Sequence, residues 1–138
     1  MSKPYVLDAC ALVAFLRKEA GWEHIKTVLM CAHDRTHTVQ MHAFNLLEVY
    51  YDMHRSIGKE KADNELRMIR NLPIIINANL SDDIFVEAGR LKANYKISLA
   101  DSIALAQTKA IDGILLTSDH HEFDVIESKE PIQFLWIR

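Results

Sequence analysis

The segment PYVLDACALVAFLRKE (residues 4–19) runs from a short apolar stretch into a helical pattern, with one carboxylate, Asp8, at the junction. Short apolar runs without alternation are typical of strands that are covered on both faces, as in a parallel sheet. The same passage from strand to helix recurs along the chain. Strands interleaved with helices predict an α/β fold with right-handed crossover connections.

The apolar patterns give the expected order of elements. Strands are expected at residues 4–8, 36–40, 73–77, 113–118 and 132–137, and helices at residues 9–19, 21–33, 42–57, 58–72, 81–95 and 98–110. The chain of 138 residues is long enough for one domain with its own core, which we expect over residues 1–138. Apolar residues form 49% and charged residues 25% of the chain, as in ordinary globular proteins.

Charge, cysteine content and hydropathy narrow the setting. The net charge of −3 gives no chain-wide attraction to nucleic acid or acidic membranes, although a carboxylate-rich site can coexist with a local basic rim. The two cysteines, Cys10 and Cys31, make no disulfide framework and favour a reducing compartment. The chain shows neither a signal-peptide pattern nor an apolar stretch of membrane-spanning length. We therefore expect a cytoplasmic protein without membrane association.

Four acidic residues are candidates for a functional site. Ligands bind outside the carboxyl ends of the strands in an open parallel sheet, and Asp8 and Asp119 follow two expected strands there. Asp101 lies in the first turn of an almost wholly apolar helix, and Glu48 lies on a narrow polar strip of the helix at 42–57. Converging carboxylates repel one another, and oxygen ligands of this kind suit Mg²⁺ or Mn²⁺ rather than Zn²⁺.

Each acid also has a purely structural interpretation. Asp8 can cap the helix that follows it, and Asp101 can complete a capping box with Ser98. Asp119 can initiate a turn, and Glu48 can pair with Arg55 on the surface. Taken together these interpretations are weaker than taken singly, because topology brings three of the acids to the same end of the sheet.

Four segments, in this order, carry a resemblance to a known family: YVLDACALVAFL (5–16), NLLEVYY (45–51), SLADSIALA (98–106) and LLTSDHHEFDVI (115–126). They resemble the four acidic motifs of PIN-domain ribonucleases, especially the VapC-like toxins of toxin–antitoxin pairs. The resemblance implies a three-layer α/β/α fold with a mainly parallel sheet of four to five strands, and Mg²⁺- or Mn²⁺-dependent cleavage of RNA. It carries the catalytic and metal-binding roles onto Asp8, Glu48, Asp101 and Asp119.

Three further positions follow from this resemblance. Thr117 matches the family's small hydroxyl residue, which is expected to orient Asp8. Cys10 stands where many members have serine or threonine, and a thiol is a poorer hydrogen-bond partner for a carboxylate or phosphate. Many members carry another aspartate after the last motif acid, and here either Glu122 or Asp124 can supply that carboxylate.

The residue types indicate how such a site works. No cysteine or serine is evidently paired with a histidine as an activated nucleophile, so water activated by carboxylates and metal is favoured. Asp8, Asp101 and Asp119 are expected to hold one or two cations. Glu48 is expected to bind the second cation or to orient the attacking water. Hydrolysis by metal-directed water is expected to leave 5′-phosphate and 3′-hydroxyl ends on the cleaved RNA.

Other polar residues give weaker signals. A group of basic side chains can either neutralise RNA phosphates or form a solvated helix face. The group consists of Arg17, Lys18, Arg55, Lys59, Lys61, Arg67 and Arg70. His120 and His121 adjoin Asp119 and fit ordinary loop histidines better than RNA contacts. Tyr50 and Tyr51 are expected to pack on the apolar side of their helix. The segment CAHDRTH (31–37) lacks a fourth ligand for a structural zinc site.

The resemblance also implies partners. Members of the family form homodimers, and apolar stripes on the helices at 58–72 and 81–95 are candidate surfaces. A cognate antitoxin is expected to insert an arginine among the carboxylates. The alternative is a PIN-like module that binds RNA or protein without cutting. A haloacid-dehalogenase-type phosphatase is disfavoured because Cys10 stands where that class needs its second aspartate.

Overall fold

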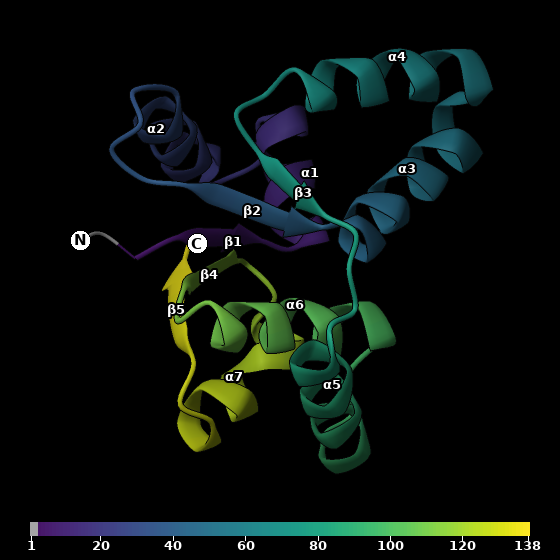
Figure 1. The fold of residues 1–138 in the computed structure, drawn as a ribbon. Helices are drawn as coiled ribbons and strands as arrows, with labels where there is room; N and C mark the ends of the chain where they lie inside the picture. The colour runs from purple at the N-terminus through teal and green to yellow at the C-terminus, as the bar shows by residue number, and fades with distance from the viewer. Residues whose placement is uncertain (1–2) are drawn as a thin grey trace.

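The computed structural model describes residues 3–138 and contains five strands and seven helices in that range. The strands are β1 Tyr5–Leu7, β2 Val39–His42, β3 Ile75–Asn77, β4 Ile114–Thr117 and β5 Gln133–Trp136. The helices are α1 Ala9–Arg17, α2 Trp22–His33, α3 Ala43–Ile57, α4 Lys59–Arg70, α5 Asp82–Asn94, α6 Leu99–Ala110 and α7 His120–Lys129. All strands pair in parallel in the order β3-β2-β1-β4-β5 (Figure 1). The expected α/β fold with a parallel sheet is therefore confirmed.

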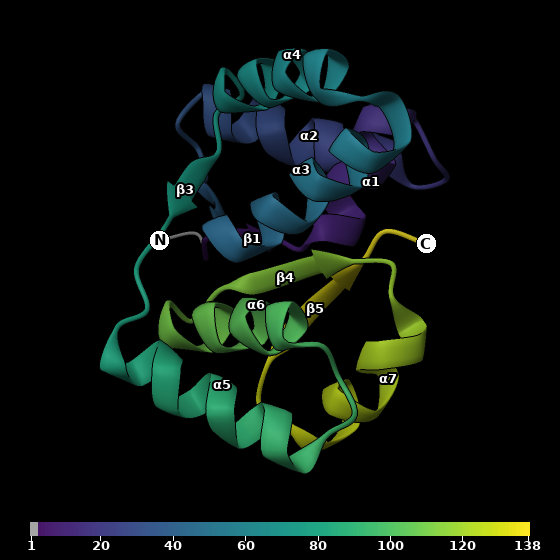
Figure 2. The same ribbon diagram turned by 90° about the vertical axis from the view of Figure 1, so that its right-hand side faces the viewer.

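The sheet lies between two helical layers. Helices α1 to α4 cover one face and α5 to α7 the other, which is clear in both views (Figures 1 and 2). Alternate residues of β1 point to opposite layers, so Leu7 enters the core beneath α1–α4 and Val6 the core beneath α5–α7. Leu116 and Leu115 of β4 divide in the same way. Coverage of both faces explains why the strands are apolar without alternation.

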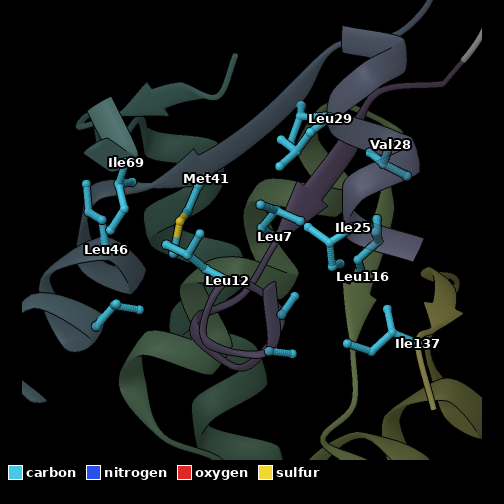
Figure 3. Packing of buried hydrophobic residues seen from close by; sticks show 14 of the residues in the cluster. Leu7, Leu12, Ile25, Val28, Leu29, Met41, Leu46, Ile69, Leu116 and Ile137 are labelled. Atoms are coloured by element: carbon cyan, nitrogen blue, oxygen red, sulfur yellow. The ribbon is translucent and has the colours of Figure 1, made fainter. Parts of the chain in front are cut away.

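The larger of the two cores joins four helices to the sheet. Leu12 of α1, Ile25 of α2 and Ile69 of α4 are fully buried against Leu7 and Met41 of the strands (Figure 3). The apolar stripe of α4 therefore packs inward, as does that of α5 through Ile84, Ala88 and Leu91. Part of each stripe that was a candidate dimer surface thus serves the core, whereas Met68 of α4 and Phe85 and Val86 of α5 remain exposed.

Two element predictions were wrong in detail. The strand expected at 36–40 is displaced to Val39–His42, because a turn after α2 occupies the first part of that segment. The helix α7 at His120–Lys129 was not predicted, since its buried face consists only of Phe123 and Ile126. The helix matters for the site because it begins directly after Asp119.

The end of the chain packs against the loop between α1 and α2. A Cβ atom on Gly21 would lie 2.0 Å from the Ile137 carbonyl oxygen, and Gly21 has a φ of +91°. Only glycine tolerates both the left-handed backbone and this close approach. The guanidinium of Arg138 donates to the Ala20 carbonyl at 3.0 Å and holds the last residue there. Within residues 3–138, no helix combines the length and apolar character needed to cross a membrane.

Candidate active site

Topology brings the candidate acids together at one edge of the sheet. In the register of β1 and β4, Leu7 lies beside Leu116, so Asp8 and Asp119 leave the same edge. Helix α6 packs on both strands, and Asp101 lies in its first turn. Glu48 belongs to α3, which packs against α6. We call Asp8, Glu48, Asp101 and Asp119 the acidic cluster.

Asp8 is the most buried member of the acidic cluster, with 2% of its surface exposed. It caps α1 by accepting a hydrogen bond from the Ala11 backbone N–H at 2.7 Å. Burial raises the pKa of Asp8 from 3.8 to about 7, and the charges of Asp101 and Asp119 act in the same direction. A hydrogen bond with the Thr117 hydroxyl opposes this rise in pKa.

Asp101 is held at the start of α6. Its backbone N–H donates to the Ser98 hydroxyl at 3.0 Å, and Ser98 caps the helix. Burial raises the pKa of Asp101 from 3.8 to about 6, and a hydrogen bond with Ser98 opposes the rise. The charges that raise it further belong to Asp119, Glu48 and Glu122, in decreasing order.

Asp119 stands between β4 and α7. It caps α7 by accepting a hydrogen bond from the Glu122 backbone N–H at 3.2 Å. Its own backbone N–H donates to the Thr117 hydroxyl at 3.0 Å. Because Thr117 also hydrogen-bonds with Asp8, this one buried hydroxyl links the two aspartates.

Glu48 joins the acidic cluster from α3, in the helical layer opposite to that of α6. Burial is the main cause that raises the pKa of Glu48, and the charges of Asp119 and Asp52 raise it further. The expected alternative partner, Arg55, instead binds Asp52 at 2.7 Å. Glu48 therefore lies among carboxylates rather than beside a cation.

Two side chains near the acidic cluster have buried oxygens that find no hydrogen-bond partner among residues 3–138. One is Oε2 of Glu122, whose charge acts on Asp101. The other is Oδ1 of Asn45, while Nδ2 of Asn45 donates to the Ala100 carbonyl at 3.2 Å. Asp124, the alternative to Glu122, instead hydrogen-bonds with His120 at 2.7 Å on the surface. The arrangement thus associates Glu122, and not Asp124, with the cluster.

A hollow of about 250 Å³ adjoins the acidic cluster. Glu48, Tyr51 and Cys10 contribute to its lining. The Cys10 thiol lies 2.8 Å from the Ser118 hydroxyl, so a serine side chain supplies the hydroxyl that Cys10 lacks. The prediction that Tyr51 packs was wrong: Tyr51 is 54% exposed, whereas Tyr50 is half-buried and donates to Asp63 at 2.6 Å.

Several candidate basic residues are engaged with acids. Arg55 and Arg17 both approach Asp52, and Lys59 pairs with Asp63 at 2.6 Å. These pairs lie on the surface of α1, α3 and α4, so they match the solvated-face interpretation for these three cations.

The acidic cluster consists of carboxylate oxygens, the ligands that hard divalent cations prefer. Among residues 3–138, no three Asp, Glu, His or Cys side chains are already arranged around a common point as metal ligands. Asp8 and Asp119 instead each direct one carboxylate oxygen to a helix N-terminus. The donor set still fits a hard divalent cation, because it consists of carboxylates that repel one another and includes the unpartnered Glu122 oxygen nearby. Asp8 and Asp119 can therefore each cap a helix and still belong to the acidic cluster.

Solved structures with the same fold include toxin–antitoxin complexes. Over 96% of this chain and 97% of the other, the chain is similar to a structure of VapBC2 from Rickettsia felis bound to a promoter DNA fragment, with 15% identity and a TM-score of 0.73. It is similar to DNA-bound VapBC from Salmonella typhimurium at 14% identity and a TM-score of 0.71, over 99% and 100% of the two chains. A third is VapC20 of Mycobacterium tuberculosis, described as a sarcin–ricin loop cleaving toxin, at 12% identity, a TM-score of 0.60, and 80% and 86% coverage.

No curated protein matches the sequence. The sequence model of the PIN domain matches residues 5–129, which include β1, α7 and all four members of the acidic cluster. The four acidic motifs and the parallel sheet that gathers them agree with that match. The chain belongs to the PIN-domain family.

Proposed function

We propose that this protein is a Mg²⁺- or Mn²⁺-dependent endoribonuclease and the toxin of a toxin–antitoxin pair. One observation carries the proposal: four carboxylates from four separate segments gather at one sheet edge, and the charges that act on Asp8, Glu48 and Asp101 are those of other carboxylates. Membership of the PIN-domain family and the fold shared with VapC20, a sarcin–ricin loop cleaving toxin, support it. A set of helix caps alone needs no such mutual repulsion.

Asp8, Asp101 and Asp119 would hold the cation, with Glu122 as the further carboxylate. When bound, a divalent cation lowers the pKa of water and neutralises charge that develops on the phosphate. Glu48 faces the group from α3 and would hold a second cation or orient the attacking water. Thr117 fixes the relative position of Asp8 and Asp119 through its hydroxyl.

A cleavage assay tests this proposal directly. Purified protein is incubated with a mixed RNA pool in chelator, Mg²⁺ or Mn²⁺, and the product ends are identified. We expect cleavage only with metal, leaving 5′-phosphate and 3′-hydroxyl ends. Asp119→Asn should be inactive, whereas Asp112→Asn, a change to an exposed aspartate at the opposite sheet edge, should cut normally.

The alternative function is a PIN-like module that binds RNA or protein without cutting. The same assay separates the two functions. Binding of RNA without cleavage in either metal would favour the alternative, and metal-independent cleavage would contradict the proposed role of the acids.

The proposed inhibitor is a cognate antitoxin that inserts an arginine among the carboxylates. A planar guanidinium binds carboxylate in bidentate fashion and offsets the negative charge. The hollow next to Glu48 shares Val13 and Val49 with a neighbouring groove between α1 and α3, which offers an apolar surface to the same partner. Inhibitor affinity should therefore fall as Mg²⁺ is added, and an affinity independent of metal would show that the inhibitor binds elsewhere.

We further propose a cytoplasmic single-domain protein, covering residues 1–138, that forms a homodimer. An exposed apolar stripe on α3 is a candidate for the dimer surface, in addition to the exposed side chains of Met68 on α4 and of Phe85 and Val86 on α5. Phe44, Leu47 and Tyr51 in that stripe are 40%, 55% and 54% exposed. Sedimentation at about 20 μM should give a dimer that Leu47→Glu converts to monomer. A wild-type monomer at that concentration would reject the dimer.

A further inference from the structure

Three aromatic rings form a ladder on the strand at the edge of the sheet. The rings of Phe134 and Trp136 in β5 are nearly parallel, at 8°, with centroids 5.4 Å apart. The His120 ring of α7 stacks on Trp136 with centroids 3.8 Å apart and an angle of 13°. We call Phe134, Trp136 and His120 the aromatic ladder, of which His120 is the outermost ring.

The aromatic ladder stands next to the acidic cluster. In the register of β4 and β5, Trp136 lies beside Thr117, the residue whose hydroxyl links Asp8 and Asp119. His120 follows Asp119 directly and begins α7. An RNA strand bound at the acidic cluster would therefore pass His120, the outermost ring of the aromatic ladder.

The polar edges of the outer rings are already engaged within the protein. Nδ1 of His120 hydrogen-bonds with Asp124 at 2.7 Å, and Nε2 hydrogen-bonds with the Arg138 carbonyl at 2.8 Å. The Trp136 indole N–H donates to Glu127 at 2.9 Å. The His120 side chain is nevertheless 49% exposed. Since Trp136 covers one face, the His120 ring offers its other face to solvent.

The aromatic ladder is also held rigidly from behind. The backbone N–H of Ile137 donates to the Thr117 carbonyl at 3.0 Å, and Ile137 is buried. Phe123 of the core supports Phe134 at a centroid distance of 5.7 Å. A preorganised ring loses little conformational freedom when a ligand stacks on it.

We infer that the outer face of His120, backed by Trp136 and Phe134, is a stacking platform for a nucleobase of the RNA next to the scissile phosphate. This inference rests on the proposed function. A nucleobase fits this surface because it presents a flat π face, and the engaged nitrogens of His120 leave stacking as the available mode of contact. Stacking tolerates any base, so the platform positions the strand without selecting its sequence.

The test compares side chains that keep or remove the ring face. RNA binding is measured in the Asp101→Asn background, so that cleavage does not interfere, with a short single-stranded RNA and the same oligomer carrying one abasic position. We expect His120→Leu to weaken binding of the intact RNA about tenfold. His120→Phe should restore most of the affinity, because it retains a stacking face. His121→Leu, at the neighbouring exposed histidine, should leave affinity unchanged.

A spectroscopic measurement supplies a readout besides affinity. With Trp22→Phe in place, Trp136 is the single tryptophan of the chain, and its fluorescence should change when a base stacks on His120, the ring that covers it. The abasic oligomer should bind equally well to proteins with and without the His120→Leu change when the missing base is the stacked one. Melting curves of each variant show that the fold is retained.

The outcomes separate this inference from the proposed function. If wild type cleaves RNA and His120→Leu changes neither affinity nor KM, the platform is wrong and the nuclease stands. If His120→Leu raises KM about tenfold, leaves kcat unchanged and is rescued by His120→Phe, the platform is supported. A protein that neither binds nor cleaves RNA in any metal overturns both.

Discussion

The carboxylates that lie near the two ends of α6 have opposite electrostatic surroundings. At its N-terminal end lies the acidic cluster, where burial and neighbouring carboxylates raise the pKa values of Asp8 and Asp101. At its C-terminal end Lys109 belongs to an ion-pair network with Glu87, Arg90 and Glu130. Hydrogen bonds from Arg90 lower the pKa values of Glu87 and Glu130. One fold thus neutralises its carboxylates at one end and leaves them without a cation at the other.

The two groups of carboxylates differ in whether the protein itself neutralises their charge. The ion-pair network satisfies its own charges: Arg90 bridges Glu87 and Glu130 at 2.5 and 2.6 Å, and Tyr95 donates to Glu130 at 2.5 Å. In the acidic cluster the carboxylates repel one another, and a bound cation, an arginine or protonation of the aspartates would relieve that repulsion. Such unrelieved charge is a cost to stability that a purely structural site has no reason to bear.

The largest expected effect breaks the comparison at the acidic cluster. Asp101→Asn removes a charge but keeps the side-chain shape, so RNA cleavage should fall by at least about a hundredfold, beyond the loss seen for outer-shell partners of a metal. The matched change at the other end of the helix pair, Glu87→Gln, should cut RNA at the wild-type rate. Initial rates at saturating Mg²⁺ measure both variants. Equal loss in the two variants would show that cleavage responds to stability alone.

The pH dependence of stability should have opposite signs at the two ends. Asp8 and Asp101 bind protons more tightly in the folded state, with pKa values of about 7 and 6 against 3.8, so their stabilisation is present at low pH and lost as pH rises. Metal-free protein should lose about 5 kcal/mol of unfolding free energy from these two groups between pH 4.5 and 7.5. Glu87 and Glu130 contribute stability that is lost only on acidification. Urea denaturation in chelator across this pH range measures the difference. In Asp8→Asn, the unfolding free energy should fall less at the upper end of the range than it does in wild type.

A smaller effect is expected when the ion-pair network is broken. Arg90→Met leaves Glu130, whose side chain is 8% exposed, without its strongest partner. The unfolding free energy should fall by about 2 kcal/mol, because a largely buried carboxylate loses its hydrogen bonds to a cation. Cleavage per folded molecule should be unchanged. An Arg90→Met protein that is as stable as wild type would mean that the network contributes nothing to folding.

The smallest expected effect concerns the uncharged support of the acidic cluster. Thr117→Val keeps the buried volume but removes the hydroxyl that binds the Asp119 backbone N–H and Asp8. We expect a stability loss of about 1 kcal/mol and a cleavage loss of about tenfold, as for other groups that orient ligands. Thr117→Ser should retain most of the activity. Wild-type rates for the valine variant would contradict a positioning role.

The sequence predicted the fold because its signals are local. Apolar runs such as YVL and ILLT mark strands that are covered on both faces, and their junctions with helices mark the edge where the acids gather. Helix α7 was not predicted because only Phe123 and Ile126 form its buried face. The start of β2 was misjudged since the polar residues of 36–38 continue the turn after α2.

The site was harder to predict where its contacts join distant segments. The four acids stand out by motif, but whether each caps a helix or joins a cluster cannot be told from spacing. The structure combines both arrangements for Asp8 and Asp119. Glu122 and Asp124 look equivalent in the sequence, and they are separated in the structure by the charge of Glu122 on Asp101 and by the pairing of Asp124 with His120. The stacking of His120 on Trp136 joins residues from α7 and β5 and has no local signal at all.

The need of the acidic cluster for a cation can be measured by thermal unfolding. Melting temperatures of wild type and Asp101→Asn are recorded at pH 7.5 in chelator and across a series of Mg²⁺ and Mn²⁺ concentrations. Metal that binds only the folded state raises the melting temperature with concentration. The melting temperature of wild type should rise steadily with metal, whereas that of Asp101→Asn should start at the same value or higher and respond little. A variant that starts lower and rises as much as wild type would contradict this expectation, because Asp101 would then be a helix cap and not a ligand.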